Sequence, residues 1–95
     1  MATYILLSTL TDDGAETLTK NPTRLREVNQ ELEKLGARVR EQYATLGGFD
    51  FVNIVDAPDN RAIARVSALL AARGSVRIMT LPAIPIEEFL DSLAK

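Results

Sequence analysis

The sequence contains no cysteine, no histidine and no tryptophan in its 95 residues. Without cysteine the chain forms no disulfide, carries no thiolate nucleophile and offers no thiolate ligand to zinc. Without histidine it has no imidazole base that titrates near neutral pH and no imidazole metal ligand. These absences exclude thiol redox chemistry and most hydrolase triads, and we expect neither a metal nor a cofactor. Any acid–base chemistry would have to use Asp, Glu, Tyr, Lys or Arg.

Charge and hydropathy narrow the class of protein further. The formal net charge is −2 and the basic residues form no run, so we expect no nucleic-acid partner. No apolar stretch approaches the roughly 20 residues that a membrane span needs. The N-terminal segment 1–4 lacks the basic residues of a secretory signal. We therefore expect one cytoplasmic domain over residues 1–95, with no membrane partner.

Four segments have the composition of strands, because they are rich in β-branched and other apolar residues and are bounded by Gly, Pro or Asp. Two of them meet at Gly47-Gly48, which suits a two-residue type I′ hairpin that needs positive φ at both positions. Such a loop places Tyr43 opposite Val52. The predicted strands are residues 3–10, 37–46, 49–56 and 75–81.

Three segments are predicted to be helical, and residues 15–20 are ambiguous. The first helix is expected to begin at Asn21-Pro22, because asparagine caps and proline suits the first helical position, and to end at Gly36. The second runs from about residue 57 to Arg73. A short terminal helix over 85–94 is expected to turn its apolar side inward. The first helix has a charged, solvated face of Arg24, Arg26, Glu27, Glu31, Glu33 and Lys34, and the terminal helix has an apolar face of Ile86, Phe89, Leu90 and Leu93.

The order β-α-β-β-α-β predicts an α+β, ferredoxin-like fold with a four-stranded antiparallel sheet, both long helices on one face and a short C-terminal helix. In the first strand, Ile5 and Leu7 point to one face and Tyr4 and Leu6 to the other, so both faces are apolar. An antiparallel sheet with one wet face should alternate instead, and monomers rarely expose so large an apolar face. We expect a second copy of the chain to cover it, in a homodimer or higher oligomer. The alternative is that the terminal helix folds back over it.

Glu41, Tyr43 and Asp50 form a candidate ligand-binding cluster on the predicted hairpin. Tyr43 and Asp50 would be diagonal neighbours, about 7–8 Å apart at the backbone, which allows a phenol–carboxylate hydrogen bond. A carboxylate can serve as general acid or base, and a tyrosine can donate to a developing oxyanion. The structural alternative is that Asp50 binds hairpin backbone groups, Tyr43 packs in the core and Glu41 pairs with an arginine. No catalytic residue is assigned.

A weaker candidate is an anion site at the start of the first long helix. Lys20 and Arg24 flank Asn21 there, and helix N-termini attract anions. No glycine-rich phosphate loop supports this site.

The hairpin also resembles a known family. The run 43–52 (YATLGGFDFV) and the following Ala57-Pro58-Asp59 are similar to the GYD family of small bacterial proteins, which is named for a Gly-Tyr-Asp motif. Phe49 stands at the middle motif position, so the motif hydroxyl is missing while Asp50 is kept. The resemblance implies a domain related to dimeric α/β-barrel proteins, among them cofactor-independent monooxygenases and small-molecule-binding proteins. The family is largely uncharacterised, and such functions would follow only by analogy of fold.

Three functions remain open at this point. The first is a homo-oligomeric domain that binds a small organic molecule. The second is a cofactor-independent enzyme of the monooxygenase or isomerase type that uses Glu41, Tyr43 and Asp50. The third is an assembly or interaction module without a ligand. The sequence decides neither the ligand nor whether there is any activity.

Overall fold

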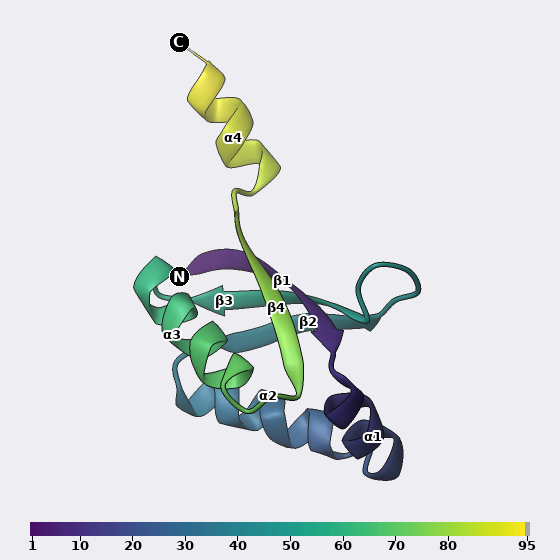
Figure 1. Cartoon of the computed structure of the whole chain (residues 1–95). Coiled ribbons are helices and arrows are strands. Elements are labelled where there is room, and N and C mark those ends of the chain that lie inside the picture. Colours follow the sequence, from purple (N-terminus) through teal and green to yellow (C-terminus); the bar gives the residue numbers. More distant parts are fainter. Residues whose placement is uncertain (95) are drawn as a thin grey trace.

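The computed structural model describes residues 1–94 and has a mixed α/β fold, with a four-stranded antiparallel sheet and four helices (Figure 1). The strand order is β2-β3-β1-β4, so β1 and β3 are central. Lys95 of the predicted domain lies outside the described residues. In chain order the elements are β1 (Ala2–Leu10), α1 (Asp12–Lys20), α2 (Arg24–Lys34), β2 (Arg38–Ala44), β3 (Phe51–Ala57), α3 (Asn60–Ala71), β4 (Val76–Ala83) and α4 (Ile86–Leu93).

The hairpin between β2 and β3 keeps the predicted register but not the predicted turn. Tyr43 lies opposite Val52, as expected. The connection runs over residues 45–50, however, and Gly47 has positive φ while Gly48 does not, so the two-residue type I′ loop is wrong. Thr45 closes the loop, because its backbone N–H donates to the Asp50 carbonyl at 2.8 Å and its hydroxyl donates to the Phe49 carbonyl at 2.6 Å. These two bonds stabilise a wider turn than the glycine pair alone predicts.

A bulge in β2 changes which face its first half presents. The register of β2 against β3 shifts between Val39 and Glu41. Val39 pairs with the buried Val55 and packs on the helix-covered side, while Glu41 pairs with Ile54 on the other side. The extra residue in a bulge reverses the alternation of side chains along the strand. In an unbroken strand the side chains of Val39 and Glu41 would share a face, and the bulge places them on opposite faces.

The ambiguous segment before residue 21 forms a full helix, and this displaces the next one. The Thr11 side chain accepts a hydrogen bond from Gly14 N–H at 3.1 Å and caps α1. Asn21 then follows the end of α1, with its N–H donating to the Thr17 carbonyl. Helix α2 begins only at Arg24, so the predicted start at Asn21-Pro22 is wrong. Asparagine serves here at a helix C-terminus, where a local hydrogen bond satisfies an otherwise unpaired carbonyl.

The well-packed part of the core lies between α3 and the sheet. Tyr4, Val55 and Val66 have the largest fully buried side chains. The Tyr4 hydroxyl donates to Asn60 Oδ1 at 2.6 Å, which satisfies the one polar atom of that ring. Helix α3 begins at Asn60 and not near residue 57 as predicted, because Ala57 still belongs to β3. Asp59 caps the helix, and its carboxylate accepts from Ala62 N–H at 2.9 Å.

Helix α4 does not turn inward. It projects from the end of β4 away from the sheet (Figure 1). β4 continues through Pro82, which an edge strand tolerates because one side of its backbone has no partner. Residues 84 and 85 link β4 to α4. The predicted inward side chains, Ile86, Phe89, Leu90 and Leu93, are 44 to 64 % exposed.

Candidate functional site

The face of the sheet turned away from α1, α2 and α3 carries two apolar rows, of which the first crosses all four strands and the second crosses β3, β1 and β4. In the first row Tyr43 lies opposite Val52, Val52 opposite Leu7, and Leu7 opposite Met79. In the second, Ile54 and Ile5 pair, and Leu81 continues the row on β4. Tyr43 is 55 % and Met79 51 % exposed. We call this set, Ile5, Leu7, Tyr43, Val52, Ile54, Met79 and Leu81, the open-face patch.

Polar groups border the open-face patch. Arg40 Nη2 lies 3.3 Å from Asp56 Oδ1 and 3.4 Å from Thr3 Oγ1 at one end. Thr9 and Arg77 pair across β1 and β4 at the other end. An apolar centre with a polar rim is the usual anatomy of a protein–protein interface.

The predicted ligand-binding cluster is divided by the structure. Glu41 and Tyr43 meet on the open face, where the Tyr43 hydroxyl donates to Glu41 Oε2 at 3.0 Å. This hydrogen bond, together with repulsion between phenolate and carboxylate, raises the pKa of Tyr43. Asp50 lies elsewhere: its carboxylate accepts from Leu10 N–H at 2.7 Å, and its own N–H donates to the Ser8 carbonyl at 2.8 Å. The hydrogen-bond partner of Tyr43 is thus Glu41 and not Asp50 as predicted. A ligand-binding role for these three residues stays a prediction.

Lys20 and Arg24, the predicted anion-binding pair, are each engaged by carboxylates. Lys20 Nζ lies 2.7 Å from Glu16 Oε1 within α1. Arg24 Nη1 lies 3.2 Å from Glu31 Oε1 and 3.6 Å from Glu27 Oε2 within α2. An anion at this position would have to compete with those carboxylates, and its binding stays a prediction.

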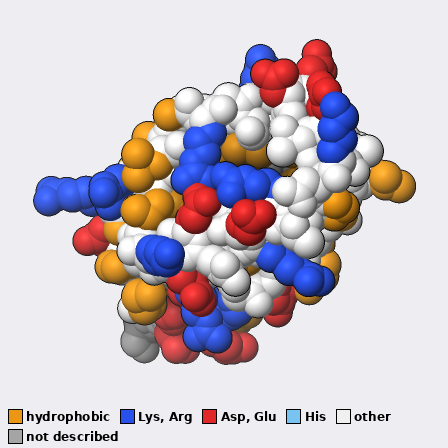
Figure 2. All heavy atoms as spheres, turned by 90° about the horizontal axis from the view of Figure 1, so that it is seen from below, with side chains coloured by type: hydrophobic (Ala, Val, Ile, Leu, Met, Phe, Trp, Pro, Cys, Tyr) orange, Lys and Arg blue, Asp and Glu red, His pale blue; other side chains and the backbone are white. Residues whose placement is uncertain are grey.

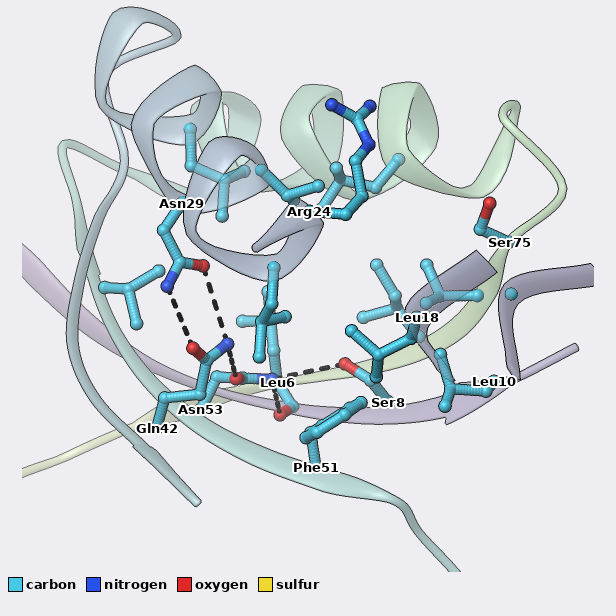
Figure 3. A pocket seen from close by; sticks show the side chains of 18 of the residues that line it. Leu6, Ser8, Leu10, Leu18, Arg24, Asn29, Gln42, Phe51, Asn53 and Ser75 are labelled. Carbon is cyan, nitrogen blue, oxygen red and sulfur yellow. Dashed lines mark hydrogen bonds between the residues drawn. The ribbon is translucent and has the colours of Figure 1, made fainter. Parts of the chain in front are cut away.

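A cavity of about 130 Å³ lies on the other side of the sheet, between the sheet and helices α1 and α2 (Figure 3). Its lining is mainly apolar and comes from strands and helices alike. Leu10 and Phe51 come from the sheet, and Leu18, Leu25 and Val28 from the helices. Glu41, Tyr43 and Asp50 do not line it.

One side of this cavity carries a network of amides. Asn29 Nδ2 donates to Gln42 Oε1 at 2.8 Å, and Gln42 Nε2 donates to Asn53 Oδ1 at 2.7 Å. The buried Asn53 then donates from Nδ2 to the Leu6 carbonyl at 3.0 Å and to Ser8 Oγ at 3.2 Å (Figure 3). The network joins α2, β2, β3 and β1, and it holds Ser8 at the cavity floor.

Two arginines of the cavity lining form ion pairs. These are Arg24 and Arg73, and both pair with Glu31 from α2. The pKa of the Glu31 carboxyl is lowered, mainly by the hydrogen bond from Arg73. Burial opposes this shift, and the positive charges of Arg73 and Arg24 add to it. Figure 2 views the helical side, where acidic and basic side chains lie next to one another with hydrophobic atoms between them. The sequence predicted that Glu31 lies on a solvated helix face. In the structure its carboxylate is instead held by Arg24 and Arg73 beside the cavity.

The sequence contained one signal for this cavity. Asn53 occurs in the run FVNIVDA, at a position whose neighbours Phe51 and Val55 point to the helix-covered side. A polar residue on the buried face of a central strand needs partners, and this could have indicated a polar network. Ser8 is likewise a polar residue on the buried face of a central strand, β1. Nothing local in the sequence indicated that Arg73 would reach Glu31.

The part of the chain that the structure describes has neither a group of metal ligands nor a membrane-spanning helix. No group of three or more His, Cys, Asp or Glu residues within 1–94 could hold a metal ion. No helix in that range is long and apolar enough to cross a membrane.

Comparison with known proteins shows the family. The GYD domain model matches residues 4–93, and the chain belongs to the GYD domain family. It is 60 % identical over 94 residues to the "Glutamine synthetase and cystathionine beta-lyase binding protein" of Thermus thermophilus, a match that covers 98 % of this chain and 99 % of that protein. The crystal structure of TTHA0845, also from Thermus thermophilus, has a similar fold, with a TM-score of 0.58 at 22 % identity over 90 % of this chain and 95 % of that one.

Proposed function

We propose that this protein is a homodimeric binding module that associates with metabolic enzymes. The observation that carries the proposal is the open-face patch, which no element of residues 1–94 covers. Burying apolar surface is the main favourable term in association, and the polar rim fits an interface with a second copy. The strand order β2-β3-β1-β4 with helices on one face supports a ferredoxin-like domain, and two such sheets face to face would form a dimeric α/β barrel.

The choice of an enzyme partner is supported by the Thermus relative. That protein is named for binding glutamine synthetase and cystathionine β-lyase, and the similarity spans nearly the full length of both chains. Helix α4 provides a surface for such a partner, because it projects away from the sheet with its apolar side exposed. Acidic Glu87, Glu88 and Asp91 on the same helix would set the polar edge of that contact.

Two substitutions separate dimerisation from enzyme binding. Met79→Arg places a charge at the centre of the open-face patch, and we expect the dimer to weaken by at least roughly 30-fold in sedimentation experiments. Phe89→Arg on α4 should leave the dimer intact and weaken binding to glutamine synthetase or cystathionine β-lyase of the same organism, measured by biolayer interferometry. Leu46→Arg is the matched control, because Leu46 is fully exposed in the hairpin loop and contacts neither surface.

Three results would contradict parts of this proposal. A wild-type protein that sediments as a monomer at micromolar concentration excludes the dimer. A wild-type protein that binds neither enzyme excludes the adaptor role. Equal effects of Leu46→Arg and Met79→Arg would show that the open-face patch is not the interface.

A further inference from the structure

We propose that the cavity between α1, α2 and the sheet is a binding site for a small, uncharged, single-ring molecule with one hydroxyl group, of the phenol class. This site lies on the helix-covered side of the sheet, so it is independent of the open-face patch and of the proposed role in protein binding. The argument uses the packing of the core, the size of the cavity, its polar floor and the charged residues of its lining.

The core is filled unevenly. Beneath α3, Tyr4 and Val66, which do not line the cavity, retain 1 % of their accessible surface. Beneath α1 and α2, Phe51 and Leu25 are only half-buried, although they point into the same layer. Protein interiors are normally packed to the density of organic crystals, and an unfilled space costs stability. A gap confined to one half of the layer is therefore expected to serve as a site for something other than the chain.

The size and lining of the gap select a small apolar ring. Its volume is about 130 Å³, and the side chains around it are mostly leucine, valine, isoleucine and phenylalanine. An engineered cavity of ~150 Å³ with such a lining stays dry and binds benzene. A larger fused-ring molecule would not fit without displacing α1 or α2.

Ser8 supplies one polar contact within this apolar space. Its Oγ accepts from Asn53 Nδ2, while its hydroxyl hydrogen donates to no atom among residues 1–94. Figure 3 shows Ser8 between Leu6, Leu10, Leu18 and Phe51. A ligand hydroxyl on the ring would accept from Ser8, and the amide network holds Ser8 in place for that contact.

The charged residues of the lining favour an uncharged ligand. Arg24 and Arg73 face the cavity, but Glu31 and Glu27 are paired with them, so two positive charges are balanced by two negative ones. An anion would have to separate these pairs, and a cation would meet two guanidinium groups.

Methyl NMR with phenol and benzene tests this site on the full-length protein. In the wild type we expect both probes to shift the methyl resonances of Leu18, Leu25 and Val28 selectively. Ser8→Ala should weaken phenol binding about three- to tenfold and leave benzene binding unchanged, because only phenol accepts the serine hydrogen bond. Val28→Phe fills the cavity and should weaken both probes at least tenfold. Leu69→Phe, on the exposed side of α3, is the matched control and should bind both probes like the wild type.

The proposal is overturned if neither probe shifts these methyl groups selectively in the wild type. It is equally overturned if a folded Val28→Phe variant binds phenol as well as the wild type does. Should Val28→Phe fail to fold, the comparison of phenol and benzene in Ser8→Ala decides, and an equal loss of both probes contradicts the assigned contact. Dimerisation and enzyme binding are measured separately, so failure here leaves those results intact.

Discussion

Gly14 lies directly against the backbone of Ser75. A Cβ atom at Gly14 would sit 2.0 Å from the Ser75 carbonyl oxygen, although the two residues are far apart in the chain. The same carbonyl accepts from Thr11 N–H at 3.0 Å, and the Thr11 hydroxyl donates to the Gly74 carbonyl at 2.6 Å. The start of α1 is thereby attached to the loop before β4, and glycine is required for this close approach.

Gly14→Ala should therefore destabilise the protein by about 3 kcal/mol, because backbone and not a flexible side chain occupies the space. Urea unfolding followed by circular dichroism measures the change. Gly48→Ala is the control: nothing lies within 4 Å of its Cβ position and its φ is not positive, so the change should stay within about 0.5 kcal/mol. Equal stabilities of the two variants would contradict the close approach.

Glu31→Gln should reduce stability in a pH-dependent manner. The folded-state pKa of Glu31 is lowered, so the ion pairs with Arg73 and Arg24 stabilise the fold above the unfolded glutamate pKa of about 4.3. This contribution is lost as the pH falls through the folded-state pKa. Thermal unfolding should show a lower Tm for the variant than for the wild type at pH 7. The two Tm values should approach each other as the pH falls below about 4.3, and they should meet below the folded-state pKa of Glu31. A difference that persists unchanged in acid would indicate a packing effect instead.

Tyr43 should ionise at higher pH than an ordinary tyrosine. Its hydroxyl donates to Glu41, so loss of the proton removes a hydrogen bond and brings two negative charges together. A spectrophotometric titration of the wild type, with the Tyr43→Phe titration subtracted, isolates this residue. In Glu41→Gln the curve should move to lower pH. An unchanged curve would show that the pair does not form in solution.

Asp50→Ala should cost about 2 kcal/mol, because it removes a charged acceptor from the half-buried Leu10 N–H. Asp91→Ala, on the exposed surface of α4, is the control and should be neutral. The Tyr43 titration should be the same in Asp50→Ala and the wild type, since the two side chains are not hydrogen-bonded. A shift in that titration would instead support the phenol–carboxylate contact predicted from the hairpin register.

Most elements of the fold could be predicted from local patterns. Alternation in β1 correctly separated Tyr4 and Leu6 from Ile5 and Leu7, because side chains in a strand point to opposite faces in turn. The pairing of Tyr43 with Val52 is also confirmed, since both a two-residue and a six-residue loop centred on Gly47-Gly48 give this register. A helix between the third and fourth strands was also predicted correctly, although α3 begins at Asn60 and not near residue 57.

The candidate site was predicted less well, because its parts come from distant segments. A bulge at residue 40 determines which side chains of β2 point to which face of the sheet. The amino-acid composition of the strand does not reveal such a bulge. Asp50 belongs to the hairpin in sequence but binds the end of β1 in space. The cavity joins Ser8, Asn29, Gln42 and Asn53, four polar residues on four elements, whose meeting depends on how α2 packs over the sheet.

The sequence by itself determined the alternation of strands and helices and the two apolar faces of the central strands. It did so because periodicity, caps and turn residues act over a few neighbouring positions. It also excluded thiol, imidazole and indole chemistry through the residues that it lacks. Only the tertiary structure decided that α4 leaves one sheet face open and that α1 and α2 leave a cavity over the other. Those outcomes depend on the volumes of side chains packed across the whole domain, and no local pattern records them.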